Sequence, residues 1–331
     1  MKRIFITGGA GFIGSHIAES LISKGHKVTI YDNFDSGSPE NIRSFKDKVK
    51  VIRGDIMDYS KLLRAMKGHD VISHQAAQLE ILRCIDDPLV DLRSNTVGTL
   101  NVLKAAAKNK IKRLINASSA CVYGQAESLP QGEGHPKNPN WPYGVSKLAA
   151  EKYCRIFQDY YGICVTSLRY GIVYGPREWF GRVLTYFIKR ALEKKPLIVF
   201  DRKVTRDFIF VDDVVRFHNL CLTKSSTGGQ VFNVATGKGT DLYGLAKKVK
   251  EVTGLKDRII FDSPQEGRPS KYMPERKRLP AELKKMVLDT GKAKKLTGWN
   301  PQVDLAEGIR REFLWLKANR RRWSSKGRIR V

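Results

Sequence analysis

The 331-residue sequence predicts an α/β protein built on a doubly wound parallel sheet, with a smaller α/β lobe in its C-terminal half. Three observations support this fold. Short apolar runs alternate with helical patterns throughout the first half, and a glycine-rich turn joins the first run to the first helical pattern. In the second half the apolar runs are shorter, and the loops between them are rich in Gly, Pro and charged residues.

Five apolar runs in the first half should be strands: Ile4–Thr7, Lys27–Tyr31, Val49–Arg53, Asp70–His74 and Arg113–Ala117. Helical patterns lie between them and after the last of them, near residues 12–24, 60–67, 88–108 and 144–161. Because strands and helices alternate, the strands should lie parallel with helices on both faces, as in a Rossmann-type domain. We expect this domain to span residues 1–170, with some later segments returning to it.

The second half contains five further strand-like runs: Val165–Arg169, Leu197–Phe200, Phe208–Val211, Val231–Val234 and Ile259–Phe261. They predict a smaller lobe at residues 171–318, mainly for binding a substrate. The basic segment Lys271–Lys285 contains two prolines and should be a loop. Residues 319–331 contain a run of three arginines at positions 320–322 and should form a mobile basic tail.

The composition excludes several classes of protein. No apolar run approaches about 18 residues, so we expect no membrane span. The five cysteines are scattered without a C-x-x-C pair, which favours free thiols and a cytoplasmic location. The six histidines show no metal-ligand spacing, so we expect no metal. The net charge of +27 suits a nucleic-acid or membrane-surface partner, an anionic substrate, or simply a solvated surface.

The turn after the first strand contains Gly8, Gly11 and Gly14. A tight turn needs residues without a Cβ atom, a pyrophosphate must approach its backbone closely, and the start of the next helix supplies amide donors. These residues, with Phe12 and Ile13, therefore predict a dinucleotide-binding site.

Asp32 ends the second strand, 18 residues after Gly14. A carboxylate at this place accepts hydrogen bonds from the adenosine ribose hydroxyls and disfavours a 2′-phosphate, so we expect NAD rather than NADP. Asn33 should belong to the same site, and Asp55 and Ile56, which follow the third strand, should flank the adenine.

Tyr143 and Lys147 are four residues apart, on one face of a helix. A neighbouring ammonium group and a cationic nicotinamide ring would both favour the phenolate, which would make Tyr143 a base near neutral pH. Ser119 follows the Arg113–Ala117 strand and could bridge a substrate oxygen and Tyr143. The three residues predict proton-coupled hydride transfer, and the alternative is a helical Tyr/Lys pair without a role.

With these motifs the chain resembles the extended short-chain dehydrogenase/reductases, specifically the nucleotide-sugar epimerase/dehydratase family typified by UDP-galactose 4-epimerase. The resemblance covers roughly residues 1–318. Further matching stretches occur in the family's order: His74–Gln78, Asn95–Leu103, Ser118–Gly124, Leu168–Tyr170, Val173–Pro176, Arg206–Asp213, Phe232–Val234 and Gly298–Pro301.

The resemblance implies roles for residues that the spacing alone does not assign. Ala76, Ala77 and Gln78 would lie beside the cofactor ribose and diphosphate, with Asn95 supporting them. Arg206 and Arg278 would bind the substrate diphosphate, and Arg83 and Arg182 would border the sugar. The resemblance also implies NAD as cofactor and a homodimer, and it gives no reason to expect a membrane or nucleic-acid partner.

Two positions separate the subclasses of this family. The 4,6-dehydratases have an Asp-Glu pair just after the catalytic Ser or Thr, and the sugar-acid decarboxylases have a Glu at the second position. Here these residues are Ala120 and Cys121. We therefore expect epimerisation of a nucleotide-diphosphate sugar, first of all between UDP-glucose and UDP-galactose through a transient 4-keto intermediate.

Three alternatives stay open. The enzyme could be a uronic-acid 4-epimerase, with an arginine holding the carboxylate. It could resemble GDP-mannose 3,5-epimerase, with Cys121 as an acid/base. It could also be a non-catalytic basic Rossmann-type protein that binds nucleic acid.

Overall fold

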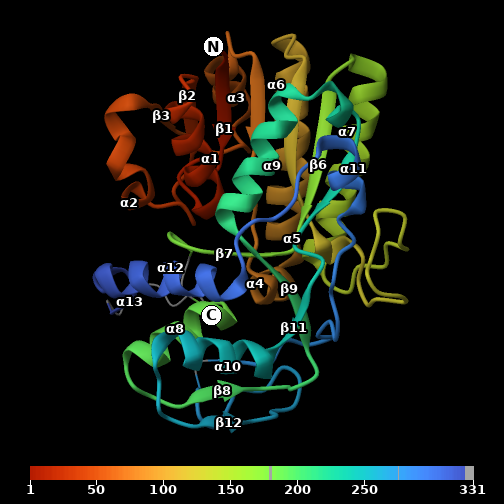
Figure 1. Cartoon of the computed structure of the whole chain (residues 1–331). Coiled ribbons are helices and arrows are strands. Elements are labelled where there is room, and N and C mark those ends of the chain that lie inside the picture. The colour runs from red at the N-terminus through yellow and green to blue at the C-terminus, as the bar shows by residue number, and fades with distance from the viewer. Residues whose placement is uncertain (179–180, 275, 325–331) are drawn as a thin grey trace.

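A seven-stranded parallel sheet forms the larger part of this computed structural model, which describes residues 1–178, 181–274 and 276–324 (Figure 1). Its strand order is β10-β6-β5-β4-β1-β2-β3. The strands are β1 Arg3–Thr7, β2 Lys27–Asp32, β3 Lys50–Arg53, β4 Val71–His74, β5 Arg113–Ser119, β6 Cys164–Tyr170 and β10 Val231–Val234. The order runs outward from β1 in both directions, which is the doubly wound topology predicted from the sequence.

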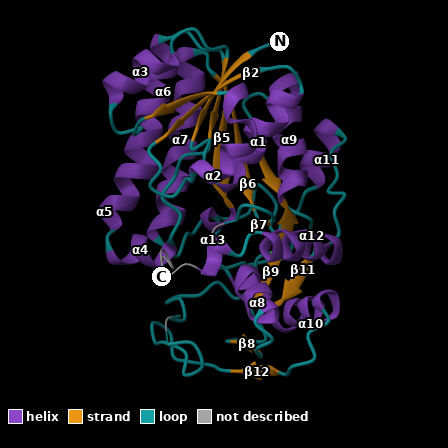
Figure 2. Cartoon of the chain, turned by 90° about the vertical axis from the view of Figure 1, so that its left-hand side faces the viewer, coloured by secondary structure: helices purple, strands orange, loops and turns teal. Residues whose placement is uncertain are grey.

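Helices cover both faces of this sheet (Figure 2). The helices α3, α6 and α7 lie on one face, and α1 and α9 lie on the other. The α-helices of this part are α1 Phe12–Ser23, α2 Pro39–Ile42, α3 Tyr59–Met66, α4 Ile81–Asp86, α5 Pro88–Asp91, α6 Gly98–Lys108, α7 Pro142–Tyr161, α9 Val211–Thr223 and α11 Gly291–Thr297. Short 3₁₀ turns occupy Arg43–Lys48, Ala120–Val122 and Ser225–Thr227.

The core has two layers because side chains alternate along each buried strand. Ile4 and Ile6 of β1 pack on one face of the sheet in a cluster with Leu21 of α1. Phe5 points to the other face, where it packs in a cluster with Val102 of α6. A continuous helical pattern was expected at residues 88–108, but a π-helical turn at Leu92–Val97 separates α5 from α6.

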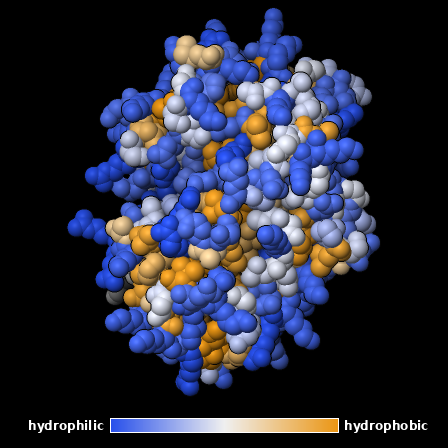
Figure 3. Space-filling view, viewed as in Figure 1, coloured by the Kyte–Doolittle hydropathy of each residue, from blue (hydrophilic) through white to orange (hydrophobic). Residues whose placement is uncertain are grey.

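The smaller lobe lies below the large sheet in Figure 1. It contains a three-stranded sheet of order β11-β9-β7 and the parallel pair β12-β8. Its elements are β7 Ile172–Tyr174, α8 Val183–Leu192, β8 Leu197–Val199, β9 Thr205–Phe210, β11 Gly239–Asp241, α10 Leu242–Thr253, β12 Ile259–Phe261, α12 Leu305–Ala318 and α13 Arg321–Ser324. In Figure 3 hydrophilic side chains dominate the upper domain, while hydrophobic side chains gather over this lobe. None of the described helices combines the length and the apolar character that a bilayer crossing demands.

Some late segments return to the large domain. The strand β10 and the helix α9 follow residue 171, and both complete this domain. Val211 begins α9 instead of ending a strand, because Asp212 and Asp213 suit the positive end of a helix. The expected mobile tail at 319–331 starts with the docked helix α13, in which Arg322 bonds to Asn41. Residues 325–331 lie outside the described part of the chain.

A buried ion pair fixes α7 to the sheet. Arg169 on β6 bonds to both carboxylate oxygens of Glu151 on α7, at 2.7 and 2.9 Å. Glu151 also accepts a short hydrogen bond from Ser118 on β5, and Arg169 donates to Tyr123 at 2.8 Å. One carboxylate therefore joins the neighbouring strands β5 and β6 to α7, the helix that connects them along the chain.

Replacing this carboxylate should destabilise the whole domain. In Glu151→Gln the buried guanidinium of Arg169 loses its counter-charge. We expect the free energy of unfolding, measured in urea, to fall by about 3–5 kcal/mol. The matched control is Asp159→Asn, which breaks the exposed pair Arg155–Asp159 on the same helix and should cost less than about 0.5 kcal/mol. Equal losses in the two variants would contradict the role given to Glu151.

Candidate active site

The glycine turn after β1 leaves no room for side chains. Gly8 has a φ of 67°, and a Cβ atom on it would lie 2.6 Å from the backbone nitrogen of Ala76. A Cβ atom on Gly14 would lie 2.2 Å from the carbonyl oxygen of Gly8. The turn can therefore hold its shape only with glycine, and it brings the first amides of α1 to the edge of a cavity.

Asp32 at the end of β2 is buried beside this turn. Its two oxygens accept hydrogen bonds from the backbone nitrogens of Ala10 and Phe34, each at 2.8 Å. Burial raises the pKa of Asp32, and these two bonds oppose that shift. A carboxylate has about four lone-pair sites, so Asp32 can still accept from ribose hydroxyls.

The cavity beside the turn has a volume of about 240 Å³. Nearly all the residues that the sequence assigns to the cofactor line it: Gly8, Gly11, Phe12, Ile13, Gly14, Asp32, Asn33, Asp55, Ile56, Ala76, Ala77, Gln78, Tyr143 and Lys147. Asn95 stands behind this wall, where its amide exchanges two 2.9 Å hydrogen bonds with the backbone of Gln78. The glycine cradle, the amides of α1 and the carboxylate of Asp32 together fit a dinucleotide.

Tyr143 and Lys147 line this cavity, and Ser119 lies next to Tyr143. Ser119 ends β5, and its hydroxyl accepts from the backbone nitrogen of Cys121 at 3.2 Å and interacts with the Tyr143 hydroxyl. Lys147 is 4 % exposed and donates to the carbonyl oxygen of Ala117 at 2.9 Å. Its Nζ atom lies 5.9 Å from the centre of the Tyr143 ring.

The pKa of Tyr143 is raised, whereas the sequence predicts that it is lowered. Burial and the nearby Cys121 raise its pKa, while Arg182 and Ser119 oppose the rise. Lys147 is not among the groups that shift it, although burial lowers the pKa of Lys147 itself to about 8. Without a bound cofactor Tyr143 is therefore a protonated phenol. The lowering of its pKa that the sequence predicts has to come from Arg182, Ser119 and a bound cationic nicotinamide ring.

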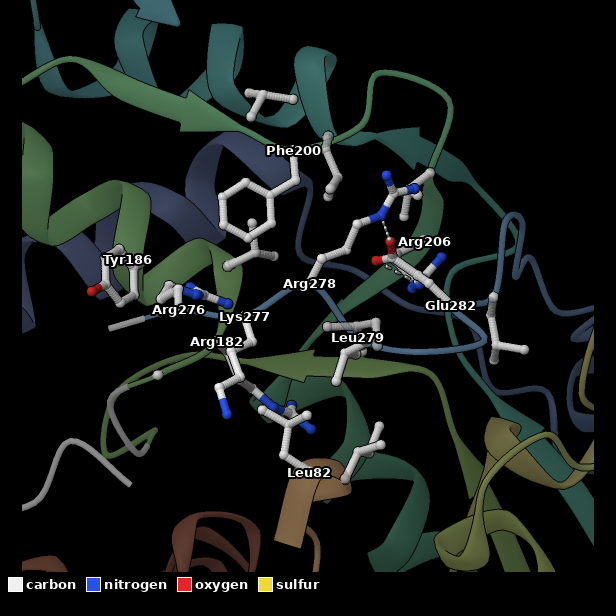
Figure 4. A pocket seen from close by; sticks show the side chains of 18 of the residues that line it. Leu82, Arg182, Tyr186, Phe200, Arg206, Arg276, Lys277, Arg278, Leu279 and Glu282 are labelled. Atoms are coloured by element: carbon white, nitrogen blue, oxygen red, sulfur yellow. Dashed lines mark hydrogen bonds and ion pairs between the residues drawn. The ribbon is translucent and has the colours of Figure 1, made fainter. Parts of the chain in front are cut away.

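A second cavity of about 290 Å³ adjoins the first, and Leu79 and Arg182 line both. Arg206 and Arg278 point into it from opposite sides (Figure 4). Glu282 lies between them, 3.8 Å from Arg206 and 3.4 Å from Arg278. Such a pair of guanidinium groups suits a diphosphate, and Glu282 can accept hydrogen bonds from hydroxyl groups beside it.

The far end of the second cavity is aromatic. Phe200 and Tyr186 line it, and the guanidinium carbon of Arg276 lies 4.4 Å from the centre of the Tyr186 ring. Flat rings of this kind can pack against a heterocycle. The cavity thus offers an apolar end, a cationic middle and, next to Cys121, a polar end that faces Tyr143.

The structure differs from the sequence-based assignment at a few positions. Arg83 lines the dinucleotide cavity and not the second one, because α4 directs it toward Asp35, 3.5 Å away. The sequence analysis missed Glu282, Arg177 and Arg322, the last two of which line the dinucleotide cavity. No spacing signal could have found Arg322, since it comes from the far end of the chain.

Arg182 is held by a buried carboxyl pair. Its Nη1 atom lies 3.4 Å from Oε1 of Glu178, and Glu178 lies beside Glu312 of α12. Neither oxygen of Glu312 has a hydrogen-bond partner among the described residues. Burial raises the pKa of Glu178 to about 7, and burial with the neighbouring Glu178 raises that of Glu312. The pair therefore keeps one shared proton at neutral pH.

A dinucleotide cavity lined by Tyr143 and Lys147, and an adjoining cavity with two arginines, fit a dinucleotide-dependent enzyme acting on a phosphorylated compound. Residues 4–235 match the sequence profile of the NAD dependent epimerase/dehydratase family. A putative UDP-glucose 4-epimerase of Methanocaldococcus jannaschii is 36 % identical over 324 residues, covering 96 % of this chain and 99 % of that protein. The crystal structure of a Thermotoga maritima UDP-glucose 4-epimerase with UDP-glucose has a TM-score of 0.87 and 33 % identity, covering 96 % of this chain and 99 % of the other.

The chain therefore belongs to the NAD-dependent epimerase/dehydratase family and is an enzyme of nucleotide-sugar chemistry, with NAD as its cofactor. Relatives with other activities are nearly as similar. A UDP-N-acetyl-alpha-D-glucosaminuronate decarboxylase of Bacillus cytotoxicus is 30 % identical over 328 residues, covering 96 % of this chain and 98 % of that protein. The family alone thus leaves the reaction and the sugar open.

The shared proton of Glu178 and Glu312 should make stability depend on pH. Because the pKa of Glu178 is raised, the contribution of this group to stability is present below about pH 4.5 and is lost as the pH rises through about 7. Between pH 5 and 8 the free energy of unfolding of wild type, measured by thermal unfolding, should therefore fall by about 1–3 kcal/mol more than that of Glu312→Gln. Parallel curves for the two proteins would contradict the pairing.

The control for this experiment is Glu307→Gln on the same helix. Arg310 and Arg311 lower the pKa of Glu307 to about 2, so its charge does not change between pH 5 and 8. This variant should shift the stability curve by the same amount at every pH.

Proposed function

We propose that the enzyme interconverts UDP-glucose and UDP-galactose by inverting C4 through a transient 4-keto sugar. The observation that supports this proposal is that Tyr143, in contact with Ser119, and Lys147 line the dinucleotide cavity, while Cys121 lines the adjoining cavity and, with Ala120, stands in place of acids. Elimination of water from the sugar needs an acid near C6, and this end of the cavity offers a thiol whose pKa burial raises.

Tyr143 is the group that moves the proton. When bound, NAD accepts a hydride from the sugar carbon and later returns it. Tyr143 takes the proton of the 4-hydroxyl group in the first half of the reaction and gives it back in the second. The second half of the reaction needs a neutral phenol, which the burial of Tyr143 favours. The first half needs the phenolate, which Arg182 and Ser119 favour.

Ser119 and Lys147 support this transfer. The Ser119 hydroxyl can donate to the sugar oxygen while its own position is fixed by the backbone nitrogen of Cys121. Lys147 has a pKa of about 8, so it remains mostly cationic at pH 7 and can stabilise negative charge that develops on the sugar oxygen. Arg206 and Arg278 would hold the diphosphate, and the aromatic end near Tyr186 would receive the base.

A panel of sugar nucleotides tests the proposal. The protein, with no NAD added, should convert UDP-glucose and UDP-galactose into one another, as followed by NMR of the products. Inversion of UDP-glucuronate alone would indicate a uronic-acid 4-epimerase, and inversion at C3 and C5 of a GDP-hexose would indicate a role for Cys121. A 4-keto-6-deoxy product, carbon dioxide, or no turnover of any sugar would contradict the proposal.

Tyr143→Phe is the matched control for this assay, because it removes the hydroxyl and keeps the ring. We expect the rate to fall by about 10²–10⁴-fold while the bound NAD is retained. A wild-type rate in this variant would mean that Tyr143 is structural.

We also propose that the enzyme is a homodimer, formed through α7 and the adjoining α5 and π-helical turn of two copies. These elements pack side by side, and their outer surface is apolar. The exposed apolar residues on it are Leu89, Leu92, Val145, Tyr153, Ile156 and Tyr160. An apolar patch repeated on paired helices is self-complementary about a two-fold axis. The cytoplasmic location expected from the cysteines stays a prediction.

Sedimentation equilibrium tests the dimer. Wild type should sediment as a dimer, and Ile156→Glu should sediment as a monomer, because the charge would be buried at the interface. Leu314→Glu on α12 places the same charge on an exposed apolar residue outside this surface and should leave the dimer intact. A monomeric wild type would overturn the proposal.

A further inference from the structure

The C-terminal end of the described chain returns to the dinucleotide cavity. In Figures 1 and 2 the helix α13 lies just below α2. Arg322 of α13 lines the cavity and donates from Nη2 to the Oδ1 atom of Asn41 at 2.7 Å. Asn41 in turn donates to the carbonyl oxygen of Ala10 at 2.9 Å. One amide side chain therefore connects Arg322 to the glycine turn.

Arg322 is also held from the side of the smaller lobe. Its guanidinium carbon lies 5.2 Å from the centre of the Trp315 ring on α12. The planar group is thus fixed between an indole and an amide, both of them neutral. This restraint fixes the direction of its N–H groups and lowers the entropy lost when it binds an anion.

The charge of Arg322 lacks the compensation that the other arginines of this cavity have. Arg83, Arg177 and Arg182 each lie at ion-pair distance from a carboxylate, on Asp35, Glu19 and Glu178 respectively. Among the described residues no carboxylate lies at such a distance from Arg322. An arginine in a half-buried cavity without a paired carboxylate is well placed to receive an anionic ligand.

Arg177 adds a second cation at the same place. Burial lowers the pKa of Arg322, and the charge of Arg177 lowers it further, while Glu40 opposes the shift. The Nη1 atom of Arg177 is buried and has no hydrogen-bond partner among the described residues. The adjacent carbonyl oxygen of Pro176 is held by His16 of α1 at 2.7 Å, which keeps Arg177 close to that helix. A bound anion would turn the repulsion between the two guanidinium groups into attraction to a common partner.

We propose that Arg322, brought back by the C-terminal segment, is a cofactor-binding residue that neutralises the diphosphate of bound NAD together with Arg177. The diphosphate is the anionic part of this cofactor, and it belongs beside the glycine turn to which Arg322 is connected. Arg322 lines this cavity and not the substrate cavity, so its effect should fall on the cofactor. Retention of NAD then depends on residues more than 300 positions away from the glycine turn.

The test compares Arg322→Ala with Arg320→Ala after bound cofactor has been removed. Arg320 is exposed, lies two residues away and carries the same charge, so its variant controls for overall charge. Isothermal titration should show NAD binding about 10-fold weaker in Arg322→Ala, with a smaller dependence on salt. Adenosine, which lacks the diphosphate, and UDP, which occupies the other cavity, should bind both variants as they bind wild type. Arg322→Lys should restore part of the affinity for NAD.

Equal NAD affinity in Arg322→Ala and Arg320→Ala would overturn the proposal. Equal weakening of NAD and adenosine in Arg322→Ala would overturn it too, because that result would mean a structural role in the adenosine site. If Arg322→Ala does not fold, the proposal is tested by amide hydrogen exchange in the wild-type protein. NAD should slow exchange in the peptide that contains Arg322, and adenosine should not. The same exchange with both ligands would contradict a contact with the diphosphate.

Discussion

The arrangement of Ser119, Tyr143 and Lys147 depends on one buried carboxylate, that of Glu151. It lies one turn beyond Lys147 on α7 and binds Arg169 on β6 and Ser118 on β5. Ser118 directly precedes Ser119. The same side chain therefore fixes the helix that carries Tyr143 and Lys147 against the strand that carries Ser119.

Burial has a second consequence, which is that each charged group at this site acts strongly on its neighbours. Arg182 lowers the pKa of the buried Tyr143, and burial weakens the screening of its field. Arg182 lines both cavities and is held by Glu178, whose neighbour Glu312 shares its proton. The helix α12 thus supports Arg182 from behind, and α13, which follows it, reaches the dinucleotide cavity.

The sequence predicts the features that depend on local spacing. The alternation of strands and helices, the glycine turn, Asp32 and the i, i+4 pair of Tyr143 and Lys147 all follow from patterns within short windows. Features that need distant segments to meet could not be predicted. Glu282 between two arginines, the pair of Glu178 and Glu312, and Arg322 beside Asn41 join residues whose proximity only the folded chain reveals. The direction of the pKa shift of Tyr143 failed for the same reason, because it depends on burial and on Arg182.

The central claim is that the hydrogen taken from C4 of the sugar returns to C4. UDP-glucose labelled with deuterium at C4 tests it directly, with the UDP-galactose formed analysed by NMR and mass spectrometry. The mechanism predicts that the deuterium remains at C4 and that no solvent hydrogen enters C3 or C5. Loss of the label to water, or exchange at C3 or C5, would contradict transient oxidation at C4 with Tyr143 as the base.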